Sequence, residues 1–317
     1  MDMIYTNAKR IDQGVLHKYA FDLSFGAEEN DFAMILGANE PTLEFGAFVY
    51  IESTEYGGIV DAVKTTTDGE TITYMGRTWH GVLNSKVIEP DAGEAYLTVN
   101  GNAYDILTML VSRLGLESLF RVDESAADVT IKTYKFHRYC QAYAGILDML
   151  SGNSAKLQMT WKDRYVYLSA VPISDYTDSP VDGDLATLAV EQHGKKPNHL
   201  VCLGKGDLTE REVIHLYVDQ FGRIGTVQYY TGLDDYTQPY ENTSTEDLLT
   251  DATKHFKELL DTDTAEIALA ETDMVYDIND IVGAIDRKSG ISATTTVTQK
   301  IVKINNGVVT IEYKTGR

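Results

Sequence analysis

Acidic side chains among tyrosines are the first residues in this sequence whose types and spacing suggest chemistry. They are Tyr229, Tyr230, Asp234, Asp235, Tyr236, Tyr240 and Glu241. Two carboxylates that face each other can cleave a glycosidic bond, and aromatic rings suit a sugar-binding groove. Adjacent carboxylates in an extended chain point in different directions, however, which favours a solvated loop. A pocket with two facing carboxylates in this region is therefore the feature that would indicate an enzyme.

A glycine-rich turn is a second candidate, for nucleotide binding. Gly204-Lys205-Gly206-Asp207 follows a predicted strand and resembles half of a dinucleotide-binding fingerprint. Thr209 stands where the third glycine belongs, and no Lys-Ser or Lys-Thr pair of a phosphate-binding loop follows. We interpret this segment as a tight turn between strands and predict no cofactor.

Metal-ligating residue types occur in three groups. They are His193 with His199 and Cys202, His137 with Cys140, and the acidic residues Glu271, Asp273, Asp277 and Asp280. Zinc sites need four ligands, usually with paired cysteines, and neither histidine group reaches that number. The acidic group lacks the Asp-x-Asp-x-Asp-Gly spacing and the later Glu of a calcium loop, so we expect turn hydrogen bonds from it. No metal is predicted.

The remaining candidates also favour structural roles. Trp79 and His80 fall in a predicted strand at Thr78–Val82, where alternation would place one side chain in the core and one at the surface. Asn242-Thr243-Ser244 fits a glycosylation sequon, but nothing else indicates a secreted eukaryotic protein. No nucleophile elbow or Cys/His nucleophile signature is present. We therefore predict no catalytic residue.

Composition narrows the classes further. The chain has 317 residues, of which 48 are acidic and 27 basic, and a net charge of −21. Nucleic-acid binding needs clustered Lys and Arg, so this charge argues against it. Solubility is the simpler explanation for the excess of acidic residues. The more specific explanation is an acidic surface that nucleic acid passes without binding. The sequence shows no transmembrane run and no signal peptide, and two cysteines suit a reducing intracellular compartment.

The first element that could position these side chains is a small β-barrel domain, predicted over residues 1–97. Asp68-Gly69 is a two-residue hairpin turn that would pair Thr65 with Ile72 and Val63 with Tyr74. The predicted strands are Val15–Phe25, Asp31–Leu36, Gly46–Ile51, Gly57–Thr67, Thr71–Met75 and Thr78–Val82.

Residues 98–175 change to an α+β pattern. Asn102 can cap a helix that Gly115 ends, and a second helix ends at Gly152-Asn153. A strand at Val129–Phe136 and a hairpin around Lys162-Asp163 complete this domain. The stretch Pro172–Gly183, rich in Pro, Ser and Asp, is predicted to be a linker.

The rest of the chain is predicted to form a second small β-barrel from residues 184–240 and 275–317, with a helical insertion at 241–274. Strands are expected at His199–Leu203, Val213–Val218 and Thr226–Tyr230. Ser244 with Asp247 forms a capping-box pattern that opens the inserted helix. The predicted fold class is therefore α+β, mainly β, with two small β-barrel domains and an α+β module between them.

The strongest local signal is a hairpin at Asn306-Gly307. A two-residue turn there pairs 305 with 308, 304 with 309 and 302 with 311, which puts four aliphatic side chains on one face. The segment from Tyr276 through this hairpin resembles the C-terminal barrel of tail-hub proteins from siphophages and prophages. The segment Gly76–Leu83, where a Gly-Arg motif leads into a predicted strand, resembles their first barrel. These proteins are related to the baseplate hubs of contractile tails and injection systems.

The resemblance implies a structural protein and not an enzyme. A tail hub forms the tail-tip ring that closes the tail tube and lets DNA pass, and three chains with two barrels each would match a sixfold tube. The implied partners are other copies in a homotrimer, the distal tail or tube protein, the tape-measure protein and a tail fibre or tip protein, without a membrane or specific nucleic-acid binding. The implied location is the virion tail tip, after synthesis in the bacterial cytoplasm.

Two alternatives remain open at this point. The first is a carbohydrate-binding or cell-wall-hydrolysing tail accessory protein, for which the Tyr and Asp residues of 229–241 would form the site. The second is a generic β-rich binding module without a connection to phage tails.

Overall fold

The computed structural model divides into two compact units. Unit 1 comprises Met1–Leu188 and Glu266–Arg317, and unit 2 comprises Ala189–Ala265. The structure describes residues 2–37, 39–65, 70–178, 181–182, 186–191, 195–244, 247–260, 264–270, 275–285, 292–305 and 307–316, with 181–182, 186–191 and 264–270 described by their backbone.

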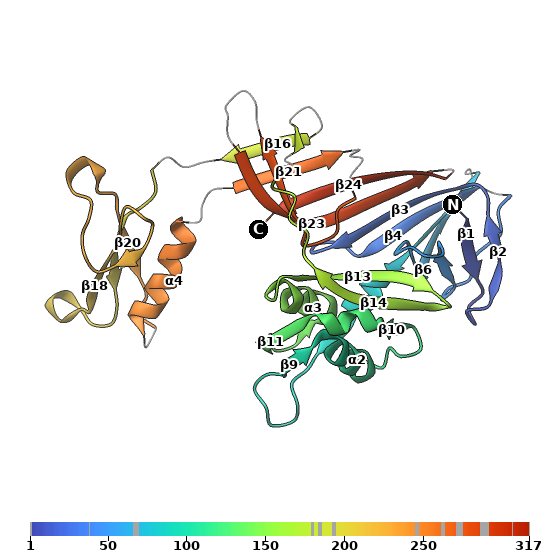
Figure 1. Cartoon of the computed structure of the whole chain (residues 1–317), viewed down its shortest axis with the longest axis horizontal. Coiled ribbons are helices and arrows are strands. Elements are labelled where there is room, and N and C mark those ends of the chain that lie inside the picture. Colours follow the sequence, from blue (N-terminus) through green and yellow to red (C-terminus); the bar gives the residue numbers. More distant parts are fainter. Residues whose placement is uncertain are drawn as a thin grey trace. The chain divides into compact units, whose positions relative to one another are not determined.

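Unit 1 is built on one large sheet that uses both ends of the chain (Figure 1). Its strands, in spatial order, are β16 (Ala186–Glu191), β21 (Thr264–Ala270), β24 (Val308–Gly316), β23 (Ser292–Asn305), β3 (Tyr19–Gly26), β4 (Asp31–Gly37), β7 (Thr71–Thr78), β6 (Gly57–Thr65), β5 (Phe48–Tyr50), β1 (Met3–Thr6) and β2 (Asp12–Leu16). Strand β22 (Ile281–Ile285) pairs with β23 and with β15 (Val181–Asp182). The fold class, α+β and mainly β, is thereby confirmed, whereas closure into two barrels stays a prediction.

Both predicted hairpin registers are confirmed. Asn305 pairs with Val308 and Val302 with Ile311 in β23–β24. Thr65 pairs with Ile72 and Val63 with Tyr74 in β6–β7, although the turn residues 66–69 lie outside the described part of the chain. Period-two alternation sends one face of each strand into the core, so Val302 and Ile304 are buried.

Strand β3 joins the two predicted barrels, because it pairs with β23 from Ala20 opposite Asn305 to Gly26 opposite Gln299. Phe21, Leu23 and Phe25 of β3 are buried beneath this pairing. The predicted strand Val15–Phe25 is in fact two strands, β2 and β3, separated by His17 and Lys18. The backbone N–H groups of that corner donate to the Glu40 carboxylate, which fixes the bend.

The predicted strand at Thr78–Val82 is wrong, because these residues turn into helix α1 (Trp79–Asn84). The Thr78 side chain accepts a hydrogen bond from Gly81 N and caps the helix. A Cβ on Gly81 would stand 2.0 Å from the Asn30 carbonyl oxygen, so only glycine fits the close approach of α1 to the β3–β4 loop. In this helix the side chains of Trp79 and His80 are both buried, so the expected alternation between core and surface is wrong.

The α+β module packs within unit 1. Its elements are β8 (Val87–Ile88), β9 (Thr98–Asn102), α2 (Ala103–Arg113), β10 (Phe120–Val122), β11 (Thr130–Lys135), β12 (Cys140–Gln141), α3 (Ala142–Ser151), β13 (Ala155–Lys162) and β14 (Tyr165–Pro172). Asn102 caps α2 and Gly115 follows it with φ +66°, as predicted. The hairpin turn is Asp163-Arg164, one residue later than predicted, since Lys162 pairs with Tyr165.

The predicted linker Pro172–Gly183 is largely ordered by pairing. Pro172 ends β14, Asp175 forms a bridge with Ile281, and Val181–Asp182 runs parallel to Ala284–Ile285. The last strands of the chain therefore hold this segment as part of unit 1.

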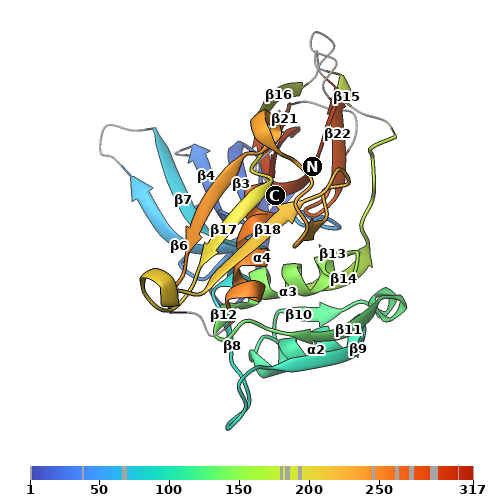
Figure 2. The same ribbon diagram turned by 90° about the vertical axis from the view of Figure 1, so that its left-hand side faces the viewer.

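Unit 2 is a four-stranded sheet with one helix against it (Figure 2). The order is β19 (Ile224–Gly225), β18 (Val213–Val218), β17 (His199–Leu203) and β20 (Thr237–Glu241), and α4 (Leu248–Leu260) covers its core. The predicted strand at Thr226–Tyr230 is wrong, and β20 lies in the predicted loop. Asp247, and not Ser244, caps α4 by accepting from Thr250 N.

The helix therefore shares a unit with β17–β20, which differs from the predicted grouping of 184–240 with the final strands. The reason is packing: Phe256 and Ala252 of α4 bury against Leu200 and Leu216 of that sheet. The other domain boundaries, at 97, 98 and 175, stay predictions, because unit 1 spans them. Within the described ranges, the chain has no helix with the length and apolarity to cross a bilayer.

Candidate functional site

A buried ion cluster ties together distant parts of unit 1. It contains two lysines and three carboxylates: Lys156, Lys300, Glu55, Asp277 and Asp280. Lys156 comes from β13, Lys300 from β23, Glu55 from the loop before β6, and the two aspartates from the turn before β22. The cluster therefore connects the α+β module to strands of the large sheet.

The Lys156–Asp280 pair is the most buried part of the cluster. Lys156 Nζ donates to the two carboxylate oxygens of Asp280 at 2.7 and 2.8 Å, and it lies 2.9 Å from Asp277 Oδ2. The Asp280 side chain is 0% exposed and also accepts the backbone N–H groups of Ser174 and Asp277. These hydrogen bonds replace the hydration that the carboxylate loses on burial.

Lys300 forms the second half of the cluster. Its Nζ lies 2.6 Å from Glu55 Oε1 and 3.9 Å from Asp277 Oδ1, and its side chain is 3% exposed. It also lies over the Phe25 ring, 5.7 Å from the centroid. The His80 ring stacks on the Phe25 ring, with 4.4 Å between the ring centroids, and His80 Nε2 lies 3.7 Å from Glu55 Oε2.

The pKa shifts of Lys156 and Asp277 favour a stable ion pair over acid–base chemistry. Burial works to lower the pKa of Lys156, but hydrogen bonds with Asp280 and Asp277 outweigh it and raise that pKa. Burial works to raise the pKa of Asp277, but Lys156 and Gln158 outweigh it and lower that pKa. A nucleophilic lysine needs a lowered pKa, whereas Lys156 stays a cation and Asp277 an anion.

Glu55 and His80 have the opposite tendency, toward the neutral form. Burial raises the pKa of Glu55, and Lys300 opposes this rise. Burial, together with the Lys300 charge, lowers the pKa of His80 to about 3, so its imidazole is neutral at pH 7. These two groups limit the net charge that the fold must bury.

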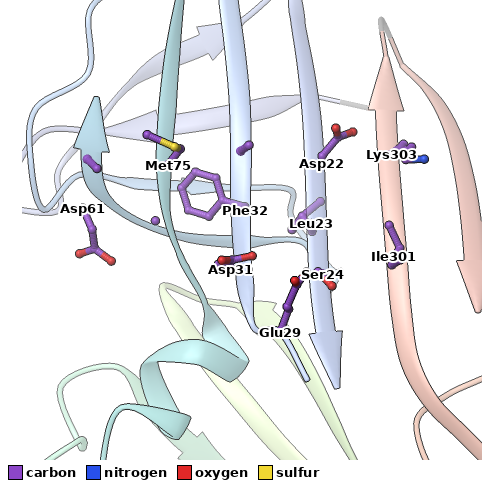
Figure 3. Close-up of a pocket in the computed structure, with 13 residues that line it drawn as sticks. Asp22, Leu23, Ser24, Glu29, Asp31, Phe32, Asp61, Met75, Ile301 and Lys303 are labelled. Atoms are coloured by element: carbon purple, nitrogen blue, oxygen red, sulfur yellow. The ribbon is translucent and has the colours of Figure 1, made fainter. Parts of the chain in front are cut away.

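A hollow of about 470 Å³ lies on the open face of the large sheet (Figure 3). Asp22, Asp31 and Asp61 line it together with the small residues Ala33 and Gly76. Asp61 pairs with Arg77 at 2.7 Å. Lys303 pairs with Glu312 at 2.8 Å. Lys303 also interacts electrostatically with Asp22, whereas Glu29 and Asp31 form no ion pair among the described residues, so this face carries an acidic excess.

The predicted acidic group is only partly visible, because Glu271 and Asp273 lie outside the described residues. Asp277 and Asp280 make the expected turn hydrogen bonds, with Asp277 N donating to Asp280 Oδ2 at 2.8 Å. Their pairing with Lys156 was not predicted. The partners are 124 residues apart, and nothing in the local sequence of β13 marks Lys156 as buried.

Among the described residues, the histidines and cysteines of the two predicted groups do not come together as a metal site. His193 lies outside the described residues. His199 and Cys202 point to opposite faces of β17: His199 contacts His215, with 2.8 Å between Nε2 and Nδ1, while Cys202 is buried in the core of unit 2. Cys140 N donates to the His137 carbonyl oxygen, which is a turn contact.

Two carboxylates of the tyrosine-rich stretch, Asp235 and Glu241, have separate partners. The Glu241 carboxylate pairs with Arg211, and Asp235 Oδ1 lies 3.5 Å from His199 Nδ1. Asp235 precedes β20 and Glu241 ends it. The strand from Thr237 to Glu241 is roughly 13 Å long, so the two positions lie at least that far apart along the chain. That spacing exceeds the roughly 5 to 9.5 Å of glycosidase pairs, and Tyr240 instead donates to Asp251.

The remaining candidates lie in turns. Gly204–Asp207 follows β17, with Gly204 N bonded to the Glu212 carbonyl and Gly206 at φ +97°, as expected for a tight turn. In the sequon, Asn242 Nδ2 donates to Asp251 Oδ2 at 2.7 Å.

Comparisons with known proteins give the fold a context. No protein-family model matches this chain, and no curated protein matches its sequence. It is similar over 100% of its length to prophage tail protein gp18 from Listeria monocytogenes EGD-e, with a TM-score of 0.55, 12% identity and 94% of that chain covered. The 43 kDa tail protein of prophage MuSo2 from Shewanella oneidensis gives a TM-score of 0.54 at 12% identity, covering 100% of this chain and 98% of that one.

A third similar structure is the P2 virion baseplate in its activated conformation, with a TM-score of 0.56, 11% identity, and 99% and 98% of the two chains covered. Identities this low establish the fold alone. The resemblance found in the sequence is confirmed at that level: this chain has the fold of prophage tail and phage baseplate proteins.

Proposed function

We propose that this chain is a structural protein of a phage or prophage tail, the hub at the tail tip, and not an enzyme. The single observation that carries this is the fold similarity over nearly the whole of both chains to tail and baseplate proteins. The ion cluster agrees with it, because its lysines are held as cations and tie elements together.

The proposed mechanism is ring assembly around a channel. The strands β24, β23, β3, β4, β7 and β6 form one continuous surface whose inner face is core and whose outer face is open. We assign the outer face to the channel wall, where its acidic excess, including Glu29 and Asp31, repels passing DNA. A closed ring of copies would also cover strand edges that a single chain leaves unpaired.

The partners follow from this role. They are other copies of the chain in a homotrimer, the distal tail or tube protein, the tape-measure protein, and a tail fibre or tip protein. The location is the virion tail tip, with the bacterial cytoplasm before assembly. The carbohydrate-binding alternative is not proposed, because Glu241 and Asp235 bind different partners.

Two measurements test the proposal. Light scattering at increasing concentration should show a species of three times the 35.2 kDa chain mass, because ring closure depends on concentration. Immunogold labelling of purified tails should mark one tip. A label distributed along the tube, or no label on tails, contradicts the hub assignment.

A further inference from the structure

A basic pocket stands out on this acidic chain. It has a volume of about 350 Å³ and lies in unit 1 between the β1–β2 turn and the β13–β14 turn. Lys9, Arg10 and Arg164 line it, and none of them forms an ion pair with a described residue. Its one carboxylate, Asp12, already accepts a hydrogen bond from the Tyr50 hydroxyl at 2.8 Å. With a net charge of −21 on the chain, three cations against one carboxylate in a single pocket mark a place for an anion.

The two turns hold the arginines in fixed and strained positions. Arg10 has φ 64° and Arg164 has φ 70°, a region where glycine or asparagine is less strained by roughly 1 kcal/mol. Arg164 Nη2 donates to the Arg10 carbonyl oxygen at 2.9 Å, which joins the two turns. The Asn7 side chain accepts from Lys9 N and Ile11 N and orders the first turn. At Arg164 the two-residue turn Asp163-Arg164 imposes the positive φ, so the backbone conformation fixes where this side chain begins.

Aromatic rings complete the pocket. Phe48, Trp161 and Tyr165 line it beside the cations. These rings are held by packing: Trp161 stacks on Trp79 with 5.0 Å between the ring centroids, and Arg10 lies over the Phe48 ring, 4.9 Å from its centroid. Cations beside packed aromatic walls suit a small anionic group.

A strand edge begins at the same place. Asp12 is both a pocket residue and the first residue of β2, which within the described chain pairs only with β1 and ends the order of the large sheet. An extended peptide can add to such an edge through main-chain hydrogen bonds while its side chains enter neighbouring pockets. Pocket and edge together therefore describe a site for a segment of protein.

We propose that this pocket binds a carboxylate of a short, extended, acidic segment of a partner protein, which pairs along β2. A peptide needs only one or two carboxylates, whereas a long polyanion would also meet the repulsion of a chain with net charge −21. Guanidinium groups bind carboxylates through paired N–H donors, which gives the arginines geometric selectivity. The inference goes beyond the proposed tail role and does not rest on it.

The test uses the full chain and a fluorescein-labelled peptide, Thr-Val-Glu-Val-Glu-Val-Thr, followed by fluorescence anisotropy. We expect the variant Lys9→Gln, Arg10→Gln, Arg164→Gln to bind at least about tenfold more weakly, because charge-assisted hydrogen bonds are lost. A matched variant, Lys64→Gln, Lys132→Gln, Lys135→Gln, removes three exposed cations elsewhere and should bind within about twofold of the parent. Circular dichroism checks that both variants are folded.

Several results would overturn the proposal. If the same peptide with Gln in place of Glu binds equally well, the pocket does not recognise a carboxylate. Tighter, pocket-dependent binding of a thymidine oligonucleotide would assign the site to a phosphate polymer. Self-association that the pocket variant abolishes would assign it to a second copy. Unchanged affinity after N-methylation of alternate peptide amides would exclude pairing along β2, whereas a loss of affinity supports it.

Discussion

Lys156 and Asp280 show how single residues hold unit 1 together. Their pair is buried, bidentate and supported by two backbone donors to the carboxylate. We expect Lys156→Met to lower the free energy of unfolding by about 3–5 kcal/mol, because it leaves Asp280 as a buried charge without its cation. Both tryptophans of the chain, Trp79 and Trp161, lie in unit 1, so urea unfolding followed by tryptophan fluorescence measures this unit alone.

The double variant Lys156→Met, Asp280→Asn serves as the control for that prediction. Removing both charges should cost less than the sum of the single changes, since the buried charge disappears. Additive losses would mean that the two side chains do not interact in solution.

His80 makes unit 1 sensitive to acid. Its pKa is lowered to about 3 by burial and by the Lys300 charge, below the ordinary value of 6.5. Below pH 6.5 the His80 imidazole binds a proton in the unfolded chain but not in the folded chain. The free energy of unfolding therefore decreases as pH falls from 6.5 toward 3, by up to about 1.4 kcal/mol per pH unit. Urea midpoints at pH 7 and pH 4.5 measure this, and His80→Phe should reduce the difference.

Glu55 has an opposite effect within the same cluster. Its raised pKa means that the folded state binds a proton more readily than the unfolded state, so this group adds stability as pH falls. The variant Glu55→Gln should therefore make the acid sensitivity steeper. If wild type and His80→Phe lose the same stability between the two pH values, His80 is not the neutral buried group that the structure places there.

At the scale of elements, close backbone approaches decide which glycines the fold requires. A Cβ on Gly76 of β7 would stand 1.8 Å from the Ile59 carbonyl oxygen, beside the irregular pairing of β6 with β7. We expect Gly76→Ala to destabilise unit 1 by about 2–4 kcal/mol through a forced backbone shift. Gly37, at the end of β4, has open space around it, and Gly37→Ala should stay within about 0.5 kcal/mol in the same fluorescence assay.

Local signals explain which elements the sequence could predict. The hairpin at Asn306-Gly307 follows from turn chemistry and period-two alternation, both of which act within a dozen residues. The pairing of β3 with β23, and of Lys156 with Asp280, depends on contacts between distant segments and has no local signal. Helix α1 has six residues, which is too short for its apolar side chains to show a helical period. Its sequence is therefore hard to distinguish from a strand, and the structure identifies it as a helix capped by Thr78.

The same distinction explains the candidate site. The turn hydrogen bonds of Asp277 and Asp280 could be predicted, because aspartate in turns bonds nearby backbone N–H groups. The ion cluster could not, since charged side chains are ordinarily solvated and only the fold brings Glu55 and Lys300 together. The basic pocket likewise combines residues from two turns that are remote in sequence.

At the scale of the whole molecule, the division into two units makes a prediction about folding. Unit 2, Ala189–Ala265, has its own four-stranded sheet and a core of Leu200, Leu216, Ala252 and Phe256. We expect the fragment Ala189–Ala265 to fold alone and to show a cooperative thermal transition by circular dichroism. A core this small leaves a low stability.

Phe256→Ala is the matching core variant, because the ring is 0% exposed and joins α4 to β17 and β18. The expected loss of about 3–5 kcal/mol would exceed the stability of so small a unit and abolish its transition. In the full chain the same variant should leave the tryptophan-monitored unfolding of unit 1 unchanged, since both tryptophans report on unit 1. A fragment without a transition, or a unit 1 that loses stability with Phe256→Ala, would show that the two units fold as one.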